Sequence, residues 1–432
     1  MIKAFQHSPH ISLMQTQTQT RMSVLLRKAE RFVMCVLVFV IAVRLPVFAI
    51  PQFSLLTGNR CINCHVNTQG SGLRNELGWY VSHDTRMIKP ADVPLLNLLY
   101  ALDGESNAYL NGMLTLGIDA RFQLAGSHRS PDAPSRVFPM QASIYAAFTP
   151  ADWLALEGSY NAGPVRYAGQ QAWTASVIIQ PTIVSPRLRV GHFQPSVGMR
   201  YDDHTMLARS VAGANGTPLI APNFAEYGAE LSYEGVKWLT LAAGAFLPRS
   251  LAQLSAPNAT GDFVSLVPEI SANAGLQDLM GSPSYLGRAV VWLNADDHSY
   301  NSYAGASLLT NQTFSYASIF AGFGLTDKVS LMGEYALSGV KNGRQTRNIS
   351  AELTVQAASW LFPYLRGEIG TTTVTATSTT PTSVIETTFT RQVVLGAQWF
   401  LLPYIELRPE LRYVETESYR SPRFAMQLHI FY

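Results

Sequence analysis

The chain is poor in charge, in cysteine and in long apolar runs. Charged residues make up 14% of its 432 residues and the net charge is +2, whereas ordinary globular proteins carry about 25%. This balance gives no reason to expect a nucleic acid or an acidic substrate as a partner. No apolar run approaches the roughly 18 residues that a membrane-spanning helix needs. Low charge with moderate hydropathy is typical of proteins with large uncharged polar surfaces, and transmembrane β-barrels are among them.

The N-terminus has the pattern of a secretory signal peptide. A basic stretch at residues 27–31 precedes the apolar run 32–43, which is too short to cross a bilayer as a helix. Small residues at 47–49 have the spacing of a cleavage site, so we expect residues 1–49 to be removed and the mature chain to begin at Ile50. Residues 1–21 are polar and contain a Gln-Thr repeat, so Met22 is an alternative start for the signal.

Three cysteines are present, and only two of them belong to the expected mature chain. Cys35 lies within the signal, whereas Cys61 and Cys64 are followed directly by His65 in a C-x-x-C-H motif. A zinc site would require a second Cys or His pair of similar spacing, and the sequence has none. A structural disulfide is the other alternative. The motif predicts one covalently attached haem c, in which the two thiols bond to the haem and His65 is the proximal iron ligand.

The distal side of this haem needs a ligand or an open site, and the sequence leaves several residues open. His83 lies eighteen residues after His65 on a predicted helix, and Met87 is one turn further along the same face. Either would close the distal side. His204 is the alternative from a long loop, residues 198–223. The competing interpretation is that all three are ordinary surface residues.

The region from 50 to 108 differs from the rest of the chain. The spacing predicts helices over 73–87 and 93–101. Fewer than 60 residues can scarcely enclose a haem alone, so we expect this cytochrome c-like segment to pack against the remainder of the mature chain.

From about residue 110 to 432 the pattern changes to alternating apolar and polar residues. Leu114, Leu116 and Ile118 begin one apolar row opposite a polar row, over a length that crosses an apolar band as a tilted strand. Longer separators (198–223, 250–283 and 371–387) alternate with tight turns. We predict a transmembrane β-barrel of about sixteen antiparallel strands, with these starts: 110, 137, 152, 172, 186, 224, 238, 284, 300, 314, 328, 345, 360, 388, 403 and 422.

Two further features agree with a barrel. The C-terminus alternates from Phe424 to an aromatic last residue, Tyr432, as outer-membrane barrels do at the strand that directs their insertion. The polar rows carry charges of both signs, which favour no particular ion; they include Asp119, Arg121, Glu157, Arg187, Arg189, Glu230, Arg288, Arg366, Glu368 and the row 406–412.

A signal peptide, one C-x-x-C-H motif close to the mature N-terminus and about sixteen strands together resemble the fused monohaem cytochrome–porins of bacterial outer membranes. The resemblance implies that the barrel surrounds or holds the haem segment, in the lumen or at the periplasmic side. It also implies a periplasmic cytochrome or other electron carrier and an extracellular redox partner, with outer-membrane lipid around the barrel. Known members oxidise extracellular Fe(II), but residues 67–78 depart from the iron-oxidase pattern, so electron transfer with another substrate stays open.

The sequence therefore supports one main function and two alternatives. The main prediction is electron transfer between an extracellular donor or acceptor and periplasmic carriers through the single haem. The first alternative is a porin for small solutes whose haem-bearing segment gates the pore or acts as a sensor. The second is a periplasmic electron carrier that uses the barrel as an anchor.

Overall fold

The structure is a computed structural model that describes residues 52–67, 70, 72–94, 106–125, 135–163, 171–199, 206, 224–248, 282–295, 299–325, 328–340, 345–376, 384–417 and 420–432. The predicted signal peptide lies outside these residues. Pro46–Tyr432 belong to one compact unit, which holds both the C-x-x-C-H segment and all the strands. No helix within the described part of the chain has the length and hydropathy to cross a membrane.

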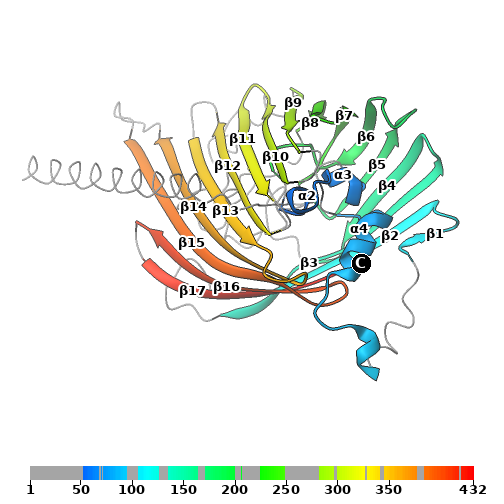
Figure 1. Ribbon diagram of the computed structural model, residues 1–432. Helices are drawn as coiled ribbons and strands as arrows, with labels where there is room; N and C mark the ends of the chain where they lie inside the picture. The colour runs from blue at the N-terminus through cyan, green and yellow to red at the C-terminus, as the bar shows by residue number, and fades with distance from the viewer. Residues whose placement is uncertain are drawn as a thin grey trace, which may run out of the picture. The chain divides into compact units, whose positions relative to one another are not determined.

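Sixteen antiparallel strands, β2 to β17, form a closed barrel of the outer-membrane type (Figure 1). Each strand pairs with the next along the chain, and β17 closes the sheet on β2, with Ala425 opposite Ala125 and Phe431 opposite Asp119. The short strand β1 (Ala108–Tyr109) extends the edge of β2. The bounds are β2 Leu114–Ala125, β3 Arg136–Ala151, β4 Leu154–Asn161, β5 Trp173–Ile179, β6 Arg187–Phe193, β7 Glu226–Val236, β8 Leu239–Leu247, β9 Ser284–Trp292, β10 Tyr300–Thr310, β11 Phe314–Leu325, β12 Val329–Val340, β13 Gln345–Val355, β14 Leu361–Ala376, β15 Val384–Leu402, β16 Ile405–Thr416 and β17 Arg420–Phe431.

These bounds confirm the strand prediction. Every predicted start lies within four residues of an observed one, and the widest differences are at β2 and β15. The agreement has a physical cause: a strand that separates lipid from lumen must alternate strictly, so its sequence carries a period-two signal along its whole length.

The barrel wall is apolar outside and polar inside. On β13 the buried residues are Thr346, Asn348, Ser350, Glu352 and Thr354, while every residue between them except the terminal Val355 is exposed. Ile319 on β11 is 64% exposed, whereas its neighbour Ser318 is 1% exposed. This is the reverse of a water-soluble sheet, and it suits a closed sheet whose outer face meets hydrocarbon.

The two ends of the barrel differ in their connections. At one end, here called the short-turn end, two residues each join β3 to β4, β7 to β8 and β15 to β16. At the opposite, long-loop end, the longest connections are 194–225 and 248–283. In outer-membrane barrels the short turns face the periplasm.

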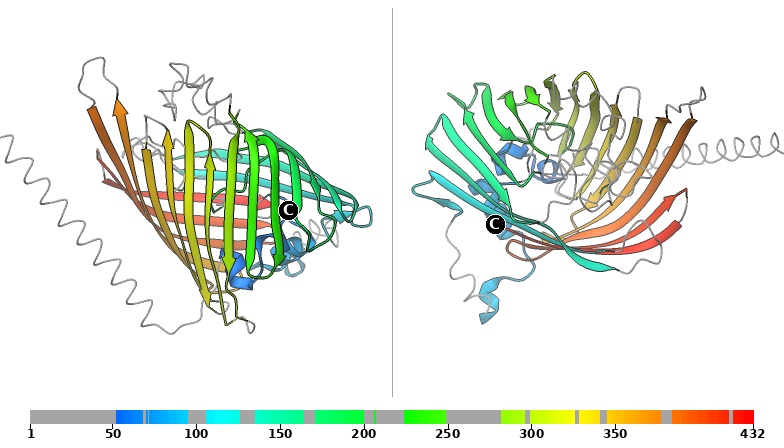
Figure 2. Two further views of the ribbon diagram at one scale, coloured as in Figure 1. Left: turned by 90° about the horizontal axis from the view of Figure 1, so that it is seen from above. Right: turned by 180° about the vertical axis from the view of Figure 1, so that it is seen from behind.

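Three α-helices and a 3₁₀ turn precede the strands and are blue in both views of Figure 2. They are α2 (Gln52–Thr57), α3 (Cys61–Cys64), α4 (Glu76–Asp84) and η1 (Pro90–Asp92). Helix α4 is the predicted helix 73–87 in shorter form, because the Asn75 side chain caps its first turn by accepting a hydrogen bond from Gly78 N–H at 3.0 Å. Most of the predicted helix 93–101 lies outside the described residues. Helix α2 was not predicted.

Candidate functional site

Helix α2 is wedged between two parts of the barrel wall. Leu55 is fully buried in a cluster from β9 to β12 together with Met199, whereas its neighbour Leu56 packs with Trp79 against an aromatic cluster from β14 to β17. Successive helical residues point about 100° apart, so one short helix reaches both walls. Burying two leucines contributes about 3–6 kcal/mol before the entropy of ordering is counted.

The inner wall leaves space for this segment at two glycines. A Cβ at Gly322 on β11 would lie 2.5 Å from Leu55 Cδ1, and a Cβ at Gly117 on β2 would lie 2.9 Å from Leu73 Cδ1. Since real Cβ atoms essentially never approach so closely, a larger residue at either position would push the leucine out. The wall and the segment are therefore complementary in shape.

Hydrogen bonds attach the segment to the short-turn end of the barrel. The Arg60 guanidinium donates to the carbonyl oxygens of Glu234 and Val236, at 3.1 and 2.6 Å, where β7 meets its turn. On the β15 side, Met87 N–H donates to the Phe400 carbonyl at 2.9 Å, and the next residue donates to Leu401. Arg187, at the start of β6, donates to the Val66 carbonyl at 2.8 Å.

The C-x-x-C-H motif forms helix α3 and its end. Cys61 and Cys64 are three residues apart, so their side chains share one helix face, and His65 N–H closes the turn on the Cys61 carbonyl at 2.9 Å. Both thiols are free and partly exposed. Burial raises the pKa of Cys61, against which a 3.3 Å contact with Ser54 Oγ works in the opposite direction. Gly70, at φ 79°, packs against Cys61 and the His65 ring.

These residues fit a covalently bound haem. Two unbridged thiols on one face would form the two thioether bonds, and the imidazole that comes after them would ligate the iron. Their chemistry does not suit a self-contained metal site: within the described ranges, no three His, Cys, Asp or Glu side chains gather around a common point.

Helix α4 touches the motif by the face opposite to most of its aromatic residues. A Cβ at Gly78 would overlap the Cys64 carbonyl, while Trp79 and His83 stack on each other at 5.6 Å and lie near Tyr404. His83 is about 140° around the helix from Gly78, and its Nδ1 is 3.1 Å from Asp84. His83 thus remains a predicted ligand that this packing does not bring to the motif.

The other two ligand candidates differ in what can be said of them. Met87 is partly exposed, and its backbone is paired with the end of β15. His204 lies outside the described residues. Met199, which the sequence did not single out, is buried beside Leu55, and Tyr303 Oη donates to its sulfur at 3.2 Å.

The predicted inward-facing charges form a ladder of pairs on β2 and β13–β17. Arg121 lies 2.8 Å from Asp119, and His429 is 3.2 Å from Asp119 and 2.9 Å from Glu406 through its two ring nitrogens. The members are Asp119, Arg121, Glu352, Arg366, Glu368, Glu406, Arg408, Glu410, Arg412 and His429, all at most 9% exposed. Because opposite charges neutralise one another within this wall, the ladder presents no strong field of one sign.

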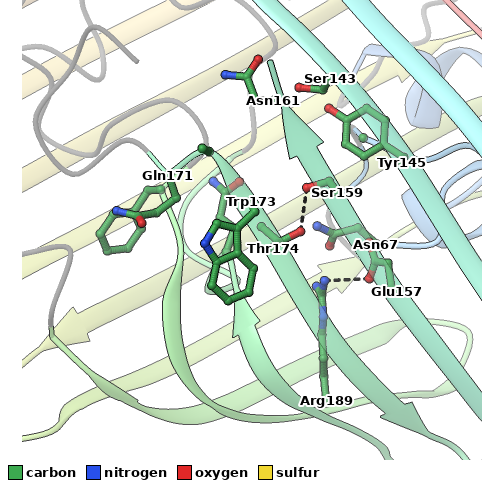
Figure 3. Close-up of a pocket in the computed structure, with 14 residues that line it drawn as sticks. Asn67, Ser143, Tyr145, Glu157, Ser159, Asn161, Gln171, Trp173, Thr174 and Arg189 are labelled. Atoms are coloured by element: carbon green, nitrogen blue, oxygen red, sulfur yellow. Dashed lines mark hydrogen bonds and ion pairs between the residues drawn. The ribbon is translucent and has the colours of Figure 1, made fainter. Parts of the chain in front are cut away.

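A polar pocket lies between the C-x-x-C-H segment and strands β3 to β6 (Figure 3). It contains about 530 Å³ of empty space, part of which is open solvent. Glu157 and Arg189 face each other across it at 2.7 Å, and Ser159 and Thr174 form a 2.7 Å hydrogen bond. Asn67 and Gly72 supply the side that belongs to the segment.

Sequence reasoning found the haem motif and the charges, but it missed the residues that hold the segment in the barrel. Leu55, Gly117 and Gly322 carry no chemical signature by themselves. Glycine within an alternating strand is a signal of close approach by another part of the chain, and that signal was present at positions 117 and 322.

Among solved structures, the chain is similar to several outer-membrane proteins. One is OprB of Pseudomonas putida at high pH, with 11% identity over 75% of this chain and 95% of that one and a TM-score of 0.49. Another is a loop-deletion mutant of the outer membrane protein OmpT of Vibrio cholerae, with 13% identity, coverage of 74% and 99%, and a TM-score of 0.47. A third is the outer membrane channel DcaP of Acinetobacter baumannii, with 8% identity, coverage of 74% and 97%, and a TM-score of 0.46. Similarity at this level carries no conclusion about activity. No protein-family model matches the chain, and no curated relative matches it.

Proposed function

We propose that the protein is an outer-membrane porin for small solutes whose periplasmic mouth is narrowed by a segment that carries one covalent haem c. The observation behind this proposal is the attachment of residues 52–94 to the short-turn end. Arg60 binds two carbonyls at the β7 turn, and Leu55 and Leu56 fix α2 to two walls. A segment held in this way restricts passage through the barrel.

This arrangement speaks against the main function that the sequence predicted. A conduit with one haem requires the haem to come close to the extracellular donor, and the apolar band of such a barrel is about 25 Å tall. The contacts of Arg60, Val66 and Met87 are all at the opposite end. The porin alternative needs no haem near the outer surface, so we prefer it.

In this proposal each part of the chain has a defined role. The barrel provides the lumen, and the paired ladder of charges keeps the wall rigid without selecting an ion of one sign. Cys61, Cys64 and His65 would hold the haem, which would supply a redox-active iron. Gly78 on α4 and Gly70 pack closely against the motif, so a change at the haem would be transmitted to how the segment sits in the mouth.

The proposal is tested by solute flux in proteoliposomes. Arg60→Ala removes both hydrogen bonds to the β7 turn, and we expect swelling in small neutral solutes to be severalfold faster than with wild type. Arg420→Ala is the matched control, because Arg420 is exposed at the long-loop end and pairs only with Glu415 in the described contacts. A wild-type barrel that is folded but impermeable, together with an unchanged Arg60→Ala, would contradict the porin function.

Electron transfer remains the second candidate, supported by the intact donor set at Cys61, Cys64 and His65. A redox partner would act on the periplasmic side, or a small donor would enter through the lumen. Sealed vesicles that contain a redox dye test this directly, with chelated Fe(II) outside as an impermeant donor. Dye reduction that depends on His65 supports a conduit, whereas a haem that cannot be reduced from outside in correctly oriented vesicles eliminates it.

A further inference from the structure

Most of the inner wall at the short-turn end is covered by the segment. Leu55 covers the β9–β12 side, and Leu56 with Trp79 covers the β14–β17 side. Leu73 covers β2 at Gly117, and Arg60 is bound at the end of β7. The pocket along β3 to β6 is the space left between the segment and the wall in this described part of the chain (Figure 3).

The lining of this pocket is rich in uncharged hydrogen-bonding groups. Inward residues of the neighbouring strands contribute hydroxyl and amide side chains, namely Ser143, Tyr145, Ser159, Asn161 and Thr174. Hydroxyls both donate and accept, and an amide offers two donors and an acceptor. Such a surface can replace the water around a solute that itself carries hydroxyl groups.

The two charges in the pocket neutralise each other. Arg189 donates to Glu157 at 2.7 Å and to Ser176 Oγ at 2.9 Å, and its guanidinium lies 4.4 Å from the Phe193 ring centroid. Both charged side chains are only 11–12% exposed. A paired, partly desolvated arginine and glutamate favour neither a cation nor an anion, but removing one partner leaves a single charge beside the passage.

We infer that solutes pass through this pocket, between Asn67 and Gly72 of the segment and the β3–β6 wall, and that it takes small neutral hydroxyl-rich solutes such as polyols. This inference rests on the proposed porin function and names its route and its solute class. Gly72 limits the width: its φ is 67°, and a Cβ there would lie 3.4 Å from the Tyr145 ring.

The test measures ion selectivity in planar bilayers under a KCl gradient. Arg189→Gln leaves Glu157 unpaired and should shift the reversal potential towards cation selectivity. Glu157→Gln leaves Arg189 unpaired and should shift it in the opposite direction, and the double variant should return to the wild-type value. Arg121→Gln breaks a comparable pair on β2, away from the pocket, and should leave selectivity unchanged.

A swelling assay addresses the solute class. Ser159→Leu should slow erythritol and ribitol uptake severalfold, while Ser338→Leu, an inward residue of β12 that does not line the pocket, should not. Faster uptake of glycine than of erythritol would assign the pocket to zwitterions instead. A wild type that conducts while Arg189→Gln and Glu157→Gln leave selectivity unchanged would overturn the route alone, whereas a folded wild type that conducts nothing would overturn the porin function itself.

Discussion

The backbone of Cys64 and Gly78 of α4 are in such close contact that no side chain fits between them. A Cβ at position 78 would overlap the Cys64 carbonyl and would lie 3.2 Å from its Cα. Asn75, which caps α4, also donates from its side chain to the carbonyl oxygens of Ile62 and Asn63, at 3.3 and 2.9 Å. The helix and the haem motif are therefore one packed unit.

Gly78→Ala should separate this unit. In a free helix alanine would be favoured by about 0.5–1 kcal/mol, but here the overlap is with backbone, and overpacking of this kind costs about 1–3 kcal/mol. We expect less covalent haem per chain and faster proteolysis of α4, while the barrel itself stays intact. Gly287→Ala is the control, because a Cβ at that position meets nothing within 4 Å. Equal haem content in both variants would mean that the contact has no role.

The haem prediction is tested by a pyridine haemochrome spectrum after expression with a cytochrome c maturation system. We expect one c-type haem per chain, and none when Cys61→Ala is combined with Cys64→Ala. Ser54→Ala removes only the contact with the Cys61 sulfur and should keep the haem. Absence of covalent haem in wild type would refute the cytochrome assignment and leave the barrel assignment untouched.

The barrel could be predicted from sequence because each strand carries its own signal. Ile349, Ala351 and Leu353 face outward and Ser350 and Glu352 inward, as their alternation alone indicates. The position of the haem segment could not be predicted, because it depends on contacts between residues far apart in the chain. Leu55 meets Gly322, for example, and no local pattern links them.

The distal ligand shows the same limit. The sequence places His83 and Met87 one turn apart on a helix, and that helix exists, although it ends at Asp84. Which face of α4 meets the motif is decided by Gly78, the only position in its first turn without a side chain to exclude the Cys64 carbonyl. A spacing argument from His65 cannot detect this.

His83→Ala tests the predicted distal ligand by absorption and EPR spectroscopy of the haem-loaded protein. We expect a shift from a low-spin to a high-spin spectrum, because the iron loses its sixth ligand. Asp84→Ala is the control: it removes the 3.1 Å contact with His83 Nδ1 and keeps the imidazole. An unchanged low-spin spectrum in His83→Ala would move the assignment to Met87 or His204.

Deleting residues 424–432 tests the closed barrel. These residues include most of β17, which pairs with β16 from Ile405 to Glu415 and with β2 from Asp119 to Ala125. Their loss leaves unpaired N–H and C=O groups on two strands, and hydrocarbon offers these groups no hydrogen-bonding partner. We expect the truncated chain to be absent from the outer membrane and to be degraded or held in the periplasm. Replacing Phe424 with leucine keeps the apolar outer row and should assemble normally, as judged by heat-modifiable migration in gels. Normal assembly of the truncated chain would show that β17 does not close the sheet.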